Sequence, residues 1–204
     1  MNKNIKKIPQ FRTEERIKKI ENVMYHRHKD FTIVAENIAD PHNVSAVFRS
    51  CDAVGILEAH IVNTRDDIIT NLSNTSSASA KKWVNAIYHN SIQECYAQLR
   101  NEGKLIYTTH LSEEAVSIYD IDLTIPFALV LGNEHSGVSE EALAGADKNI
   151  LIPQVGMIQS LNISVACAVS IYEAFRQRKA SGKFNQIGLP EAEYEKYLNE
   201  FLEK

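Results

Sequence analysis

The segment from residue 150 to residue 178 constrains the fold more than any other part of the chain. It begins with a short apolar run, residues 150–152, which Pro153 terminates as at the end of a β-strand. After a polar loop, residues 163–171 form an apolar run without a charged side chain. A helix that is apolar on every side is a buried helix. The sequence therefore predicts a buried strand joined to a buried helix, whose core residues are expected to include Val165, Val169 and Ile171.

The loop inside this segment places several hydrogen-bonding side chains between two buried elements: Gln154, Gln159, Ser160 and Asn162. Polar groups in such a position need hydrogen-bond partners. Either a ligand held by the loop or a water-filled turn would supply them. Ser160 or Asn162 is also expected to cap the free N–H groups at the start of the helix.

The composition is typical of one globular domain. The chain has 204 residues, 44% hydrophobic and 24% charged. No apolar run reaches the roughly 18 residues of a membrane span, and the N-terminus lacks the apolar core of a secretion signal. The three cysteines are far apart, and none has a Cys or His neighbour at metal-binding spacing. We therefore expect a cytoplasmic protein with reduced thiols, no membrane contact and no bound metal.

The net charge of −4 conceals two basic segments. Residues 1–29 contain nine Lys or Arg against three Asp or Glu, and residues 176–183 contain four Lys or Arg and no acid. The remainder of the chain is therefore strongly acidic. Such asymmetry indicates basic arms on an acidic body, as in proteins that bind nucleic acid. The other interpretation is that the basic side chains form the solvated face of an amphipathic helix.

Strand and helix patterns alternate along the chain, which predicts an α/β fold with a largely parallel sheet and helices on both faces. The predicted strands are residues 31–35, 59–63, 83–88 (at an edge), 104–109, 126–131 and 147–152. Helices are predicted at residues 12–29, 44–54, 91–100, 139–144, 163–179 and 190–203. Ligands of parallel sheets bind beyond the carboxyl ends of the strands. The polar loops after residues 109, 131 and 152 are therefore the candidate site.

The helix at residues 44–54 has a well-defined core face, with apolar side chains at helical spacing: Val44, Val47, Phe48, Cys51 and Val54. Asp40 and Pro41 are expected to form a turn, and Asn43 to cap the helix. Arg49 lies off the core face, where an arginine is usually a surface residue. Asp52, three positions further on, is a suitable ion-pair partner for it.

Three segments together resemble a known family. Residues 37–55 read N-x₅-N-x-x-A-x-x-R-x-x-x-A-x-G, residues 129–138 read L-x-L-G-N-E-x-x-G-V, and residues 152–166 read I-P-x-x-G-x-x-x-S-L-N-x-S-V-A. In this order they resemble motifs 1, 2 and 3 of the SpoU branch of the SPOUT methyltransferases. The likeness covers about residues 12–182. Residues 41–46, 109–112 and 160–162 resemble the wording of the subgroup that methylates the 2′-oxygen of guanosine 18 in tRNA.

The resemblance implies a SPOUT fold with a deep trefoil knot near the C-terminus. It divides the chain into a basic helical extension (residues 1–30), the methyltransferase domain (31–182) and a C-terminal helix and tail (183–204). It also implies a homodimer with active sites built across its interface, tRNA as the partner, and S-adenosylmethionine as the cofactor, which leaves as S-adenosylhomocysteine.

The resemblance also assigns residues. The implied catalytic residues are Asn43, Arg49, Glu134, Ser160 and Asn162. The implied cofactor-binding residues are Thr109, His110, Leu111, Leu131, Gly132, Ile152, Met157, Ser160 and Leu161. The basic arms would bind RNA through Arg12, Arg16, Lys18, Lys19, Arg27, Arg176 and Arg178.

In this family the motif 1 arginine, Arg49, is assigned the activation of the ribose hydroxyl, with Asn43 and Glu134 orienting it. A guanidinium has a pKa above ~12 and is a poor base. We therefore expect Arg49 to clamp a phosphate and polarise the hydroxyl, while a substrate phosphate or water takes the proton. His135 is the rival base.

Two alternatives remain open at this stage. The same chemistry on ribosomal RNA or on the tRNA wobble position is one, although about 30 residues before the first strand are more typical of the guanosine-18 subgroup. A non-catalytic RNA-binding SPOUT protein is the other. The presence of Asn43, Arg49, Glu134 and Asn162 argues against it.

Overall fold

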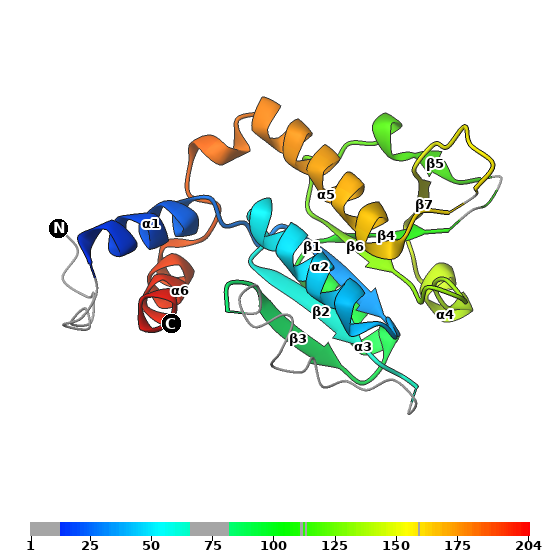
Figure 1. Ribbon diagram of the computed structural model, residues 1–204, viewed down its shortest axis with the longest axis horizontal. Coiled ribbons are helices and arrows are strands. Elements are labelled where there is room, and N and C mark those ends of the chain that lie inside the picture. Colours follow the sequence, from blue (N-terminus) through cyan, green and yellow to red (C-terminus); the bar gives the residue numbers. More distant parts are fainter. Residues whose placement is uncertain (1–12, 66–81, 111, 113, 159) are drawn as a thin grey trace.

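The computed structural model describes residues 13–65, 82–110, 112, 114–158 and 160–204. Its centre is a seven-stranded sheet in the order β3-β2-β1-β6-β4-β7-β5, in which all neighbouring strands are parallel (Figure 1). The strands are β1 (Phe31–Glu36), β2 (Glu58–Val62), β3 (Asn85–His89), β4 (Leu105–Thr109), β5 (Val116–Ser117), β6 (Phe127–Leu131) and β7 (Lys148–Leu151). The predicted α/β class and the edge position of β3 are confirmed. The two-residue strand β5 was not predicted, since so short a strand has no periodic pattern.

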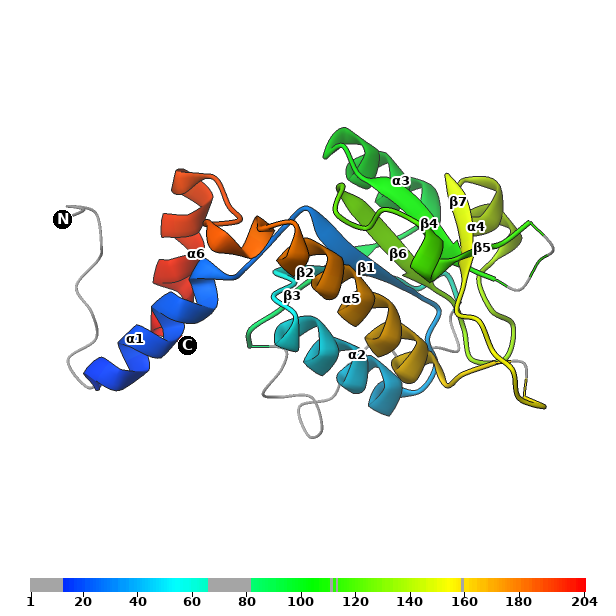
Figure 2. The same cartoon turned by 90° about the horizontal axis from the view of Figure 1, so that it is seen from above.

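Helices cover both faces of the sheet, as predicted (Figures 1 and 2). Helices α2 (Pro41–Ala53) and α5 (Ile163–Ala180) lie on one face, and α3 (Ile92–Asn101) and α4 (Glu140–Ala144) on the other. Successive residues of β1 pack on opposite faces of the sheet. Ile33 packs on the face covered by α2 and α5, and Val34 packs on the face covered by α3. Burial on both faces explains why the strands are apolar without alternation.

Helix α2 has the predicted core face but a different cap. All five predicted core residues are buried. Gly55 follows the helix with a φ of 85°. The cap is Asp40, whose side chain accepts a hydrogen bond from the His42 N–H at 2.8 Å, and Pro41 fills the first helical position. The prediction that Asn43 caps the helix was therefore wrong. Because Asp40 caps it, the Asn43 side chain is free for other contacts.

The first and last described helices pack on each other. Helices α1 (Glu14–Tyr25) and α6 (Glu191–Glu203) lie beside the end of the sheet, away from α4 and β7 (Figures 1 and 2). They share one apolar cluster, formed by Ile20, Met24, Leu57, Leu189, Tyr197, Leu198, Phe201 and Leu202. Two short 3-10 helices, η1 (Ile118–Asp120) and η2 (Lys183–Asn185), lie in the connections. The N-terminal helix therefore depends on the C-terminal helix for its packing.

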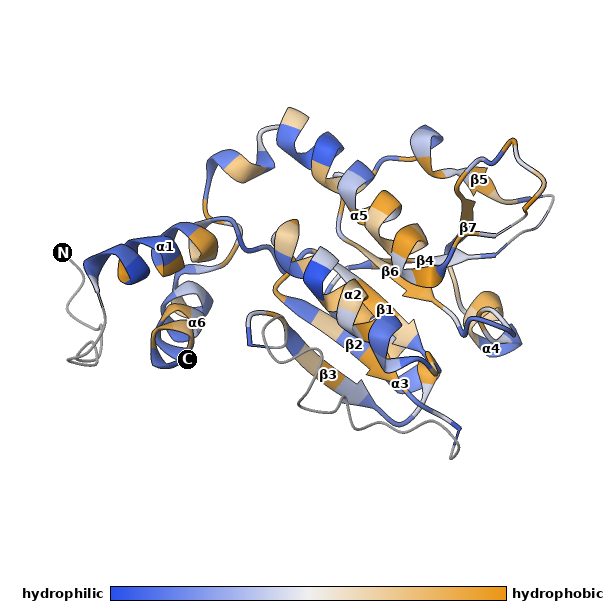
Figure 3. Ribbon diagram, viewed as in Figure 1, coloured by the Kyte–Doolittle hydropathy of each residue, from blue (hydrophilic) through white to orange (hydrophobic). Residues whose placement is uncertain are grey.

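Helix α5 is less buried than its sequence predicts. Ile171 is 1% exposed, but Val165 is 47% exposed and Val169 is only half-buried. The prediction of a core position for Val165 was wrong because one side of α5 packs on α2 and the sheet, while another side faces outward. Figure 3 shows that the first half of this helix is nevertheless hydrophobic. None of the described helices combines the length and the apolar character that a bilayer crossing demands.

Candidate active site

A pocket of about 560 Å³ opens at the carboxyl ends of β4, β6 and β7. The three loops that the sequence predicted as the candidate site meet there. Seven of the predicted cofactor-binding residues line it: Thr109, His110, Leu131, Gly132, Ile152, Ser160 and Leu161. This volume suits a drug-sized ligand. The structure thus brings together residues that are up to 52 positions apart in the chain.

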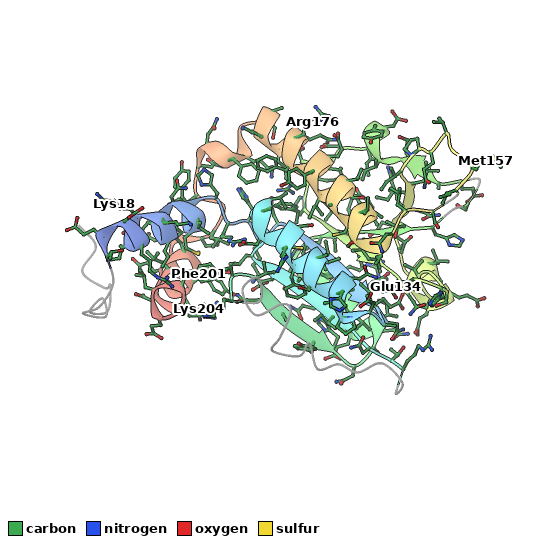
Figure 4. The ribbon with its side chains drawn as sticks, viewed as in Figure 1. Lys18, Glu134, Met157, Arg176, Phe201 and Lys204 are labelled. Atoms are coloured by element: carbon green, nitrogen blue, oxygen red, sulfur yellow. The ribbon has the colours of Figure 1, made fainter. Side chains whose placement is uncertain are left out.

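The remaining two predicted cofactor residues are Met157 and Leu111. Met157 is 99% exposed and lies at the outer tip of the loop after β7, far from Glu134 (Figure 4). This side chain does not line the pocket in this conformation, and its assignment to the cofactor stays a prediction. Leu111 lies outside the described residues.

The loop after β6 is a tight turn that forms one wall of the pocket. The Asn133 N–H donates to the Gly137 carbonyl at 2.8 Å, and the Gly137 N–H donates back to the Asn133 carbonyl at 2.9 Å. The Asn133 amide also donates to the Asn37 carbonyl at 2.8 Å, which ties the turn to the end of β1. A Cβ atom at Gly132 would lie 2.1 Å from the Gly137 carbonyl carbon. Only glycine fits at this position.

We predict that Gly132→Ala damages both stability and the pocket. Forcing a methyl group against backbone atoms costs about 1–3 kcal/mol, so the melting temperature should fall and cofactor affinity with it. Gly156→Ala is the matched control, since a Cβ atom there meets nothing within 4 Å. Thermal unfolding and calorimetric titration of both variants test this. Equal melting temperatures for the two variants would contradict it.

Three predicted catalytic residues form a continuous hydrogen-bonded chain. The Asn43 amide donates to Glu134 Oε1 at 2.9 Å, and the Asn162 amide donates to Asn43 Oδ1 at 3.2 Å. These residues come from α2, the loop after β6 and the start of α5. The chain therefore connects the three sequence motifs at one edge of the pocket, which Glu134 and Asn162 both line.

Each end of this chain is anchored to backbone. Glu134 also accepts hydrogen bonds from the N–H groups of Ala39 (3.2 Å) and Asp40 (3.3 Å), just before α2. Burial raises the pKa of Glu134, but the bonds from Asn43 and from these backbone groups outweigh it and hold the pKa below its ordinary value. The carboxylate is therefore an anion at neutral pH. At the other end, Asn162 caps α5 by accepting from the Ser164 N–H at 2.9 Å.

Arg49 lies apart from this chain in the single subunit. It is exposed on α2, about 9 Å along the helix axis from Asn43, and it does not line the pocket. Within the described part of the chain it has no hydrogen-bond or ion-pair partner. The expected pairing of Arg49 with Asp52 is absent because Asp52 pairs with Arg27 instead.

Some of the predicted RNA-binding residues are exposed to solvent, and others are buried. Arg16, Lys18 and Lys19 are exposed on α1, and Lys18 points away from the body of the protein (Figure 4). Arg176 is exposed as well and forms an ion pair with Glu173, with a closest N···O distance of 2.7 Å. Arg12 lies outside the described residues.

The assignment of Arg27 and Arg178 to RNA binding is corrected. Both side chains are 0% exposed. Arg27 forms an ion pair with Asp52 and donates to the Ile56 carbonyl at 2.8 Å. Arg178 forms an ion pair with Asp30 at 2.7 Å and stacks its guanidinium on the Phe31 ring, 4.4 Å from its centre. Burial of a charge requires such partners. Arg27 therefore holds the end of α1 to α2, and Arg178 holds α5 to the segment at the start of β1.

Sequence reasoning missed several residues of the pocket wall. Ser170 is buried, and its hydroxyl is one of four buried side-chain groups without a hydrogen-bond partner among the described residues. Ile150, Asn133 and Ala166 also line the pocket. A serine within an apolar helix was the available signal for Ser170. His135 lines the pocket as an exposed loop residue.

The comparison with family models decides the family. A model described as the SpoU rRNA Methylase family matches residues 30–172. The chain belongs to the SpoU methylase family. The tRNA (guanosine(18)-2'-O)-methyltransferase of Thermus thermophilus is 45% identical to it over 193 residues, which cover 95% of this chain and 98% of that protein. The resemblance stated from the three motifs is thereby confirmed.

Solved structures of SpoU enzymes agree with this assignment. The A. aeolicus TrmH/SpoU tRNA modifying enzyme has a TM-score of 0.83 and 37% sequence identity, and covers 93% of this chain and 96% of its own. The SpoU methyltransferase AviRb from Streptomyces viridochromogenes, in complex with the cofactor AdoMet, has a TM-score of 0.67 and 26% identity, over 77% of this chain and 61% of its own. This chain therefore shares its fold with solved enzymes of the SpoU family.

Proposed function

We propose that this protein transfers a methyl group from S-adenosylmethionine to the 2′-oxygen of guanosine 18 in tRNA. The observation that carries the proposal is the hydrogen-bonded chain Glu134–Asn43–Asn162, which joins all three family motifs beside the pocket. The Thermus relative supports the choice of tRNA and of guanosine 18, since it matches nearly its whole length. We accordingly propose that the protein works in the cytoplasm.

The pocket suits S-adenosylmethionine in size and in chemistry. The Ser170 hydroxyl, which has no hydrogen-bond partner among the described residues, offers a hydrogen bond to a polar ligand of this pocket. Thr109, Gly132, Ile152 and Leu161 would hold the cofactor through the three loops. When bound, the cofactor supplies a methyl group that its sulfonium has already activated.

The protein's own task is then to align the ribose hydroxyl and to favour loss of its proton. Alignment alone can contribute about 7–11 kcal/mol. Arg49 would clamp an RNA phosphate and polarise the hydroxyl, since its guanidinium stays charged. Glu134, as an anion, would fix the Asn43 amide, and Asn43 and Asn162 together would fix the edge of the site. Ser160, which lines the pocket, would complete it.

We further propose a homodimer in which Arg49 of one subunit serves the pocket of the other. Two features support this: Arg49 does not line its own pocket, and apolar side chains are exposed on the loop after β7 and on α5, two segments that contribute residues to that pocket. These side chains are Val155, Met157, Ile158, Leu161, Val165 and Tyr172. Burial of exposed apolar surface drives association. A deep trefoil knot formed by the chain around β7 and α5 is part of the same proposal and is compatible with the strand order β6-β4-β7.

If the proposed dimer exists, a substitution at its interface should prevent dimerisation without preventing folding. Val165→Glu should leave the subunit folded, because the side chain is 47% exposed, but should convert the dimer into monomers by burying an unpaired charge at the interface. Tyr88→Glu, at a 54% exposed position on β3, is the control and should remain dimeric. Sedimentation at micromolar concentration distinguishes them. A folded Val165→Glu protein that stays dimeric would place the interface elsewhere.

We also propose that RNA affinity comes mainly from the exposed basic side chains of α1. Reversing Arg16, Lys18 and Lys19 to Glu should weaken tRNA binding and reduce the log–log salt slope by about 2–3, at about 0.7–0.9 per phosphate contact. The melting temperature should change little, since all three are exposed. Arg100→Glu on α3, with its side chain 51% exposed, is the control. Unchanged affinity of the triple variant at low salt would remove α1 from the RNA-binding surface.

Transfer of labelled methyl groups tests the function itself. The protein is incubated with methyl-labelled S-adenosylmethionine and either unmodified tRNA or unmodified ribosomal RNA. We expect incorporation into tRNA alone. Incorporation into ribosomal RNA alone would instead favour the alternative within the family, and no incorporation into either would favour a non-catalytic RNA-binding role.

A further inference from the structure

A cluster of potential metal ligands lies on the opposite face of the sheet from α2 and α5. His60 is on β2, His89 ends β3, and Cys95 is on α3, which covers this face. One ring nitrogen of each histidine and the Cys95 sulfur lie within 4.8 Å of one another. The exposed fractions of His60, His89 and Cys95 are 0%, 7% and 0%. Such a meeting of imidazole and thiol side chains within an apolar layer needs a physical explanation.

Hydrogen bonding within the cluster does not satisfy its polar groups. His60 Nδ1 and His89 Nε2 are 2.9 Å apart and share one proton. Whichever ring carries that proton, His60 Nε2 remains without a partner among the described residues. It is left as a buried acceptor in one tautomer and as a buried donor in the other. An unpaired buried polar atom of this kind destabilises the folded state.

We propose that His60, His89 and Cys95 form a structural site for one thiophilic divalent cation, best matched by zinc. Imidazole and thiolate are the ligands that zinc prefers, at about 2.0–2.1 Å for nitrogen and 2.3 Å for sulfur. Tetrahedral ligands at these distances are about 3.3–3.6 Å apart, so the cluster closes on a cation by side-chain shifts of about 1 Å. Water takes the fourth position.

The electrostatic surroundings are compatible with a cation. Neutral imidazole is the form that binds metal, and burial of both rings favours it. The Glu94 and Glu102 carboxylates are close enough to Cys95 to act on its side chain. Those carboxylates favour positive charge nearby, and the Lys104 ammonium on this side is already paired with Glu102.

Binding is a proton-for-metal exchange without electron transfer. The Cys95 S–H bond breaks, a sulfur–zinc bond forms, and the proton leaves to solvent, while both imidazoles stay neutral. The cation would join β2, the edge strand β3 and α3 at one point. Because a ligand that binds only the folded state stabilises it, zinc should raise the melting temperature. The sequence positions gave no sign of this, since His60 and His89 are 29 residues apart.

X-ray absorption at the zinc edge provides the decisive test. The full-length protein without a polyhistidine tag is loaded with zinc, freed of excess metal and measured. We expect one zinc per chain, with a first shell that contains one sulfur and two imidazole nitrogens. A first shell of nitrogen and oxygen alone, or loss of zinc on removing the excess, would overturn the proposal. This measurement requires no variant to fold.

Cobalt provides the matched comparison of variants, because cobalt bound to a thiolate has a characteristic absorption band. Cys95→Ala and His89→Gln should abolish the band or weaken cobalt binding at least 10-fold. Cys51→Ala, at a buried free cysteine on the other face of the sheet, should keep the band. An unchanged band in Cys95→Ala would overturn the proposal. Should Cys95→Ala not fold, His89→Gln and the zinc spectrum of the unaltered protein decide.

Discussion

Replacement of Arg49 by alanine should reduce methyl transfer by about 10²–10³-fold while the affinity for S-adenosylmethionine stays the same. Loss of one group that stabilises charge in a transition state has an effect of this size. The cofactor should still bind because Arg49 is assigned to the ribose hydroxyl and an RNA phosphate, and not to the cofactor. Arg49→Lys should also fail, since an ammonium cannot reproduce the planar fork of a guanidinium. Single-turnover transfer rates and calorimetry on the same samples measure both quantities.

The same variant tests whether active sites are shared between subunits. Mixing Arg49→Ala subunits with Asn162→Ala subunits should restore partial activity, because one of the two sites in a mixed dimer then has both residues intact. Subunit exchange is verified separately by measuring the mass of the mixed dimers. No recovery after proven exchange would mean that each site is built from one chain. Loss of cofactor binding in a folded Arg49→Ala dimer would give Arg49 a different role.

Replacement of Glu134 by glutamine should impair both stability and catalysis. The carboxylate accepts from the Asn43 amide and from the N–H groups of Ala39 and Asp40. Glutamine has one acceptor oxygen and adds two donors, so donors would face donors at this site. Hydrogen bonds to charged groups contribute about 1.5–3 kcal/mol each. We expect a loss of about 1–3 kcal/mol in the free energy of unfolding, together with slower transfer as Asn43 loses its orientation.

The stability difference should also depend on pH. The pKa of folded Glu134 lies below its ordinary value of 4.5, so its contribution is present above that value and is lost as the pH falls through the folded pKa. The difference between the unaltered protein and Glu134→Gln should therefore be largest near neutral pH and shrink below pH 4.5. Glu140→Gln, an exposed carboxylate at the start of α4, is the control. A pH-independent difference would show that Glu134 acts only through its shape.

The sequence predicted much of the fold because its strands and helices are regular. The five core residues of α2 follow one helical face, and every strand except β5 was placed within a few residues. The sequence did not show which residues of a given type, such as arginine or valine, are buried and which are exposed. Arg27 and Arg178 are buried by tertiary ion pairs, and Val165 is exposed because a helix with no polar face does not reveal which side packs. Such outcomes depend on contacts that are distant in sequence.

The candidate site shows the same limit. The motifs identified Asn43, Glu134 and Asn162, but local reasoning assigned Asn43 to a helix cap, which Asp40 provides. The hydrogen bond from Asn162 to Asn43 joins residues 119 positions apart. No local pattern could reveal that contact, and the resemblance to a family was needed to connect the two residues.

The central claim is that this site methylates the ribose of guanosine 18, and mapping the methyl group on tRNA tests it most directly. Unmodified tRNA is incubated with the protein and S-adenosylmethionine and then copied by primer extension at a limiting nucleotide concentration, where a 2′-O-methyl group stops the polymerase. We predict a strong stop at guanosine 18 that requires the cofactor and is absent with Arg49→Ala. A stop at the wobble position instead, or no stop in tRNA that the protein demonstrably binds, would contradict the claim.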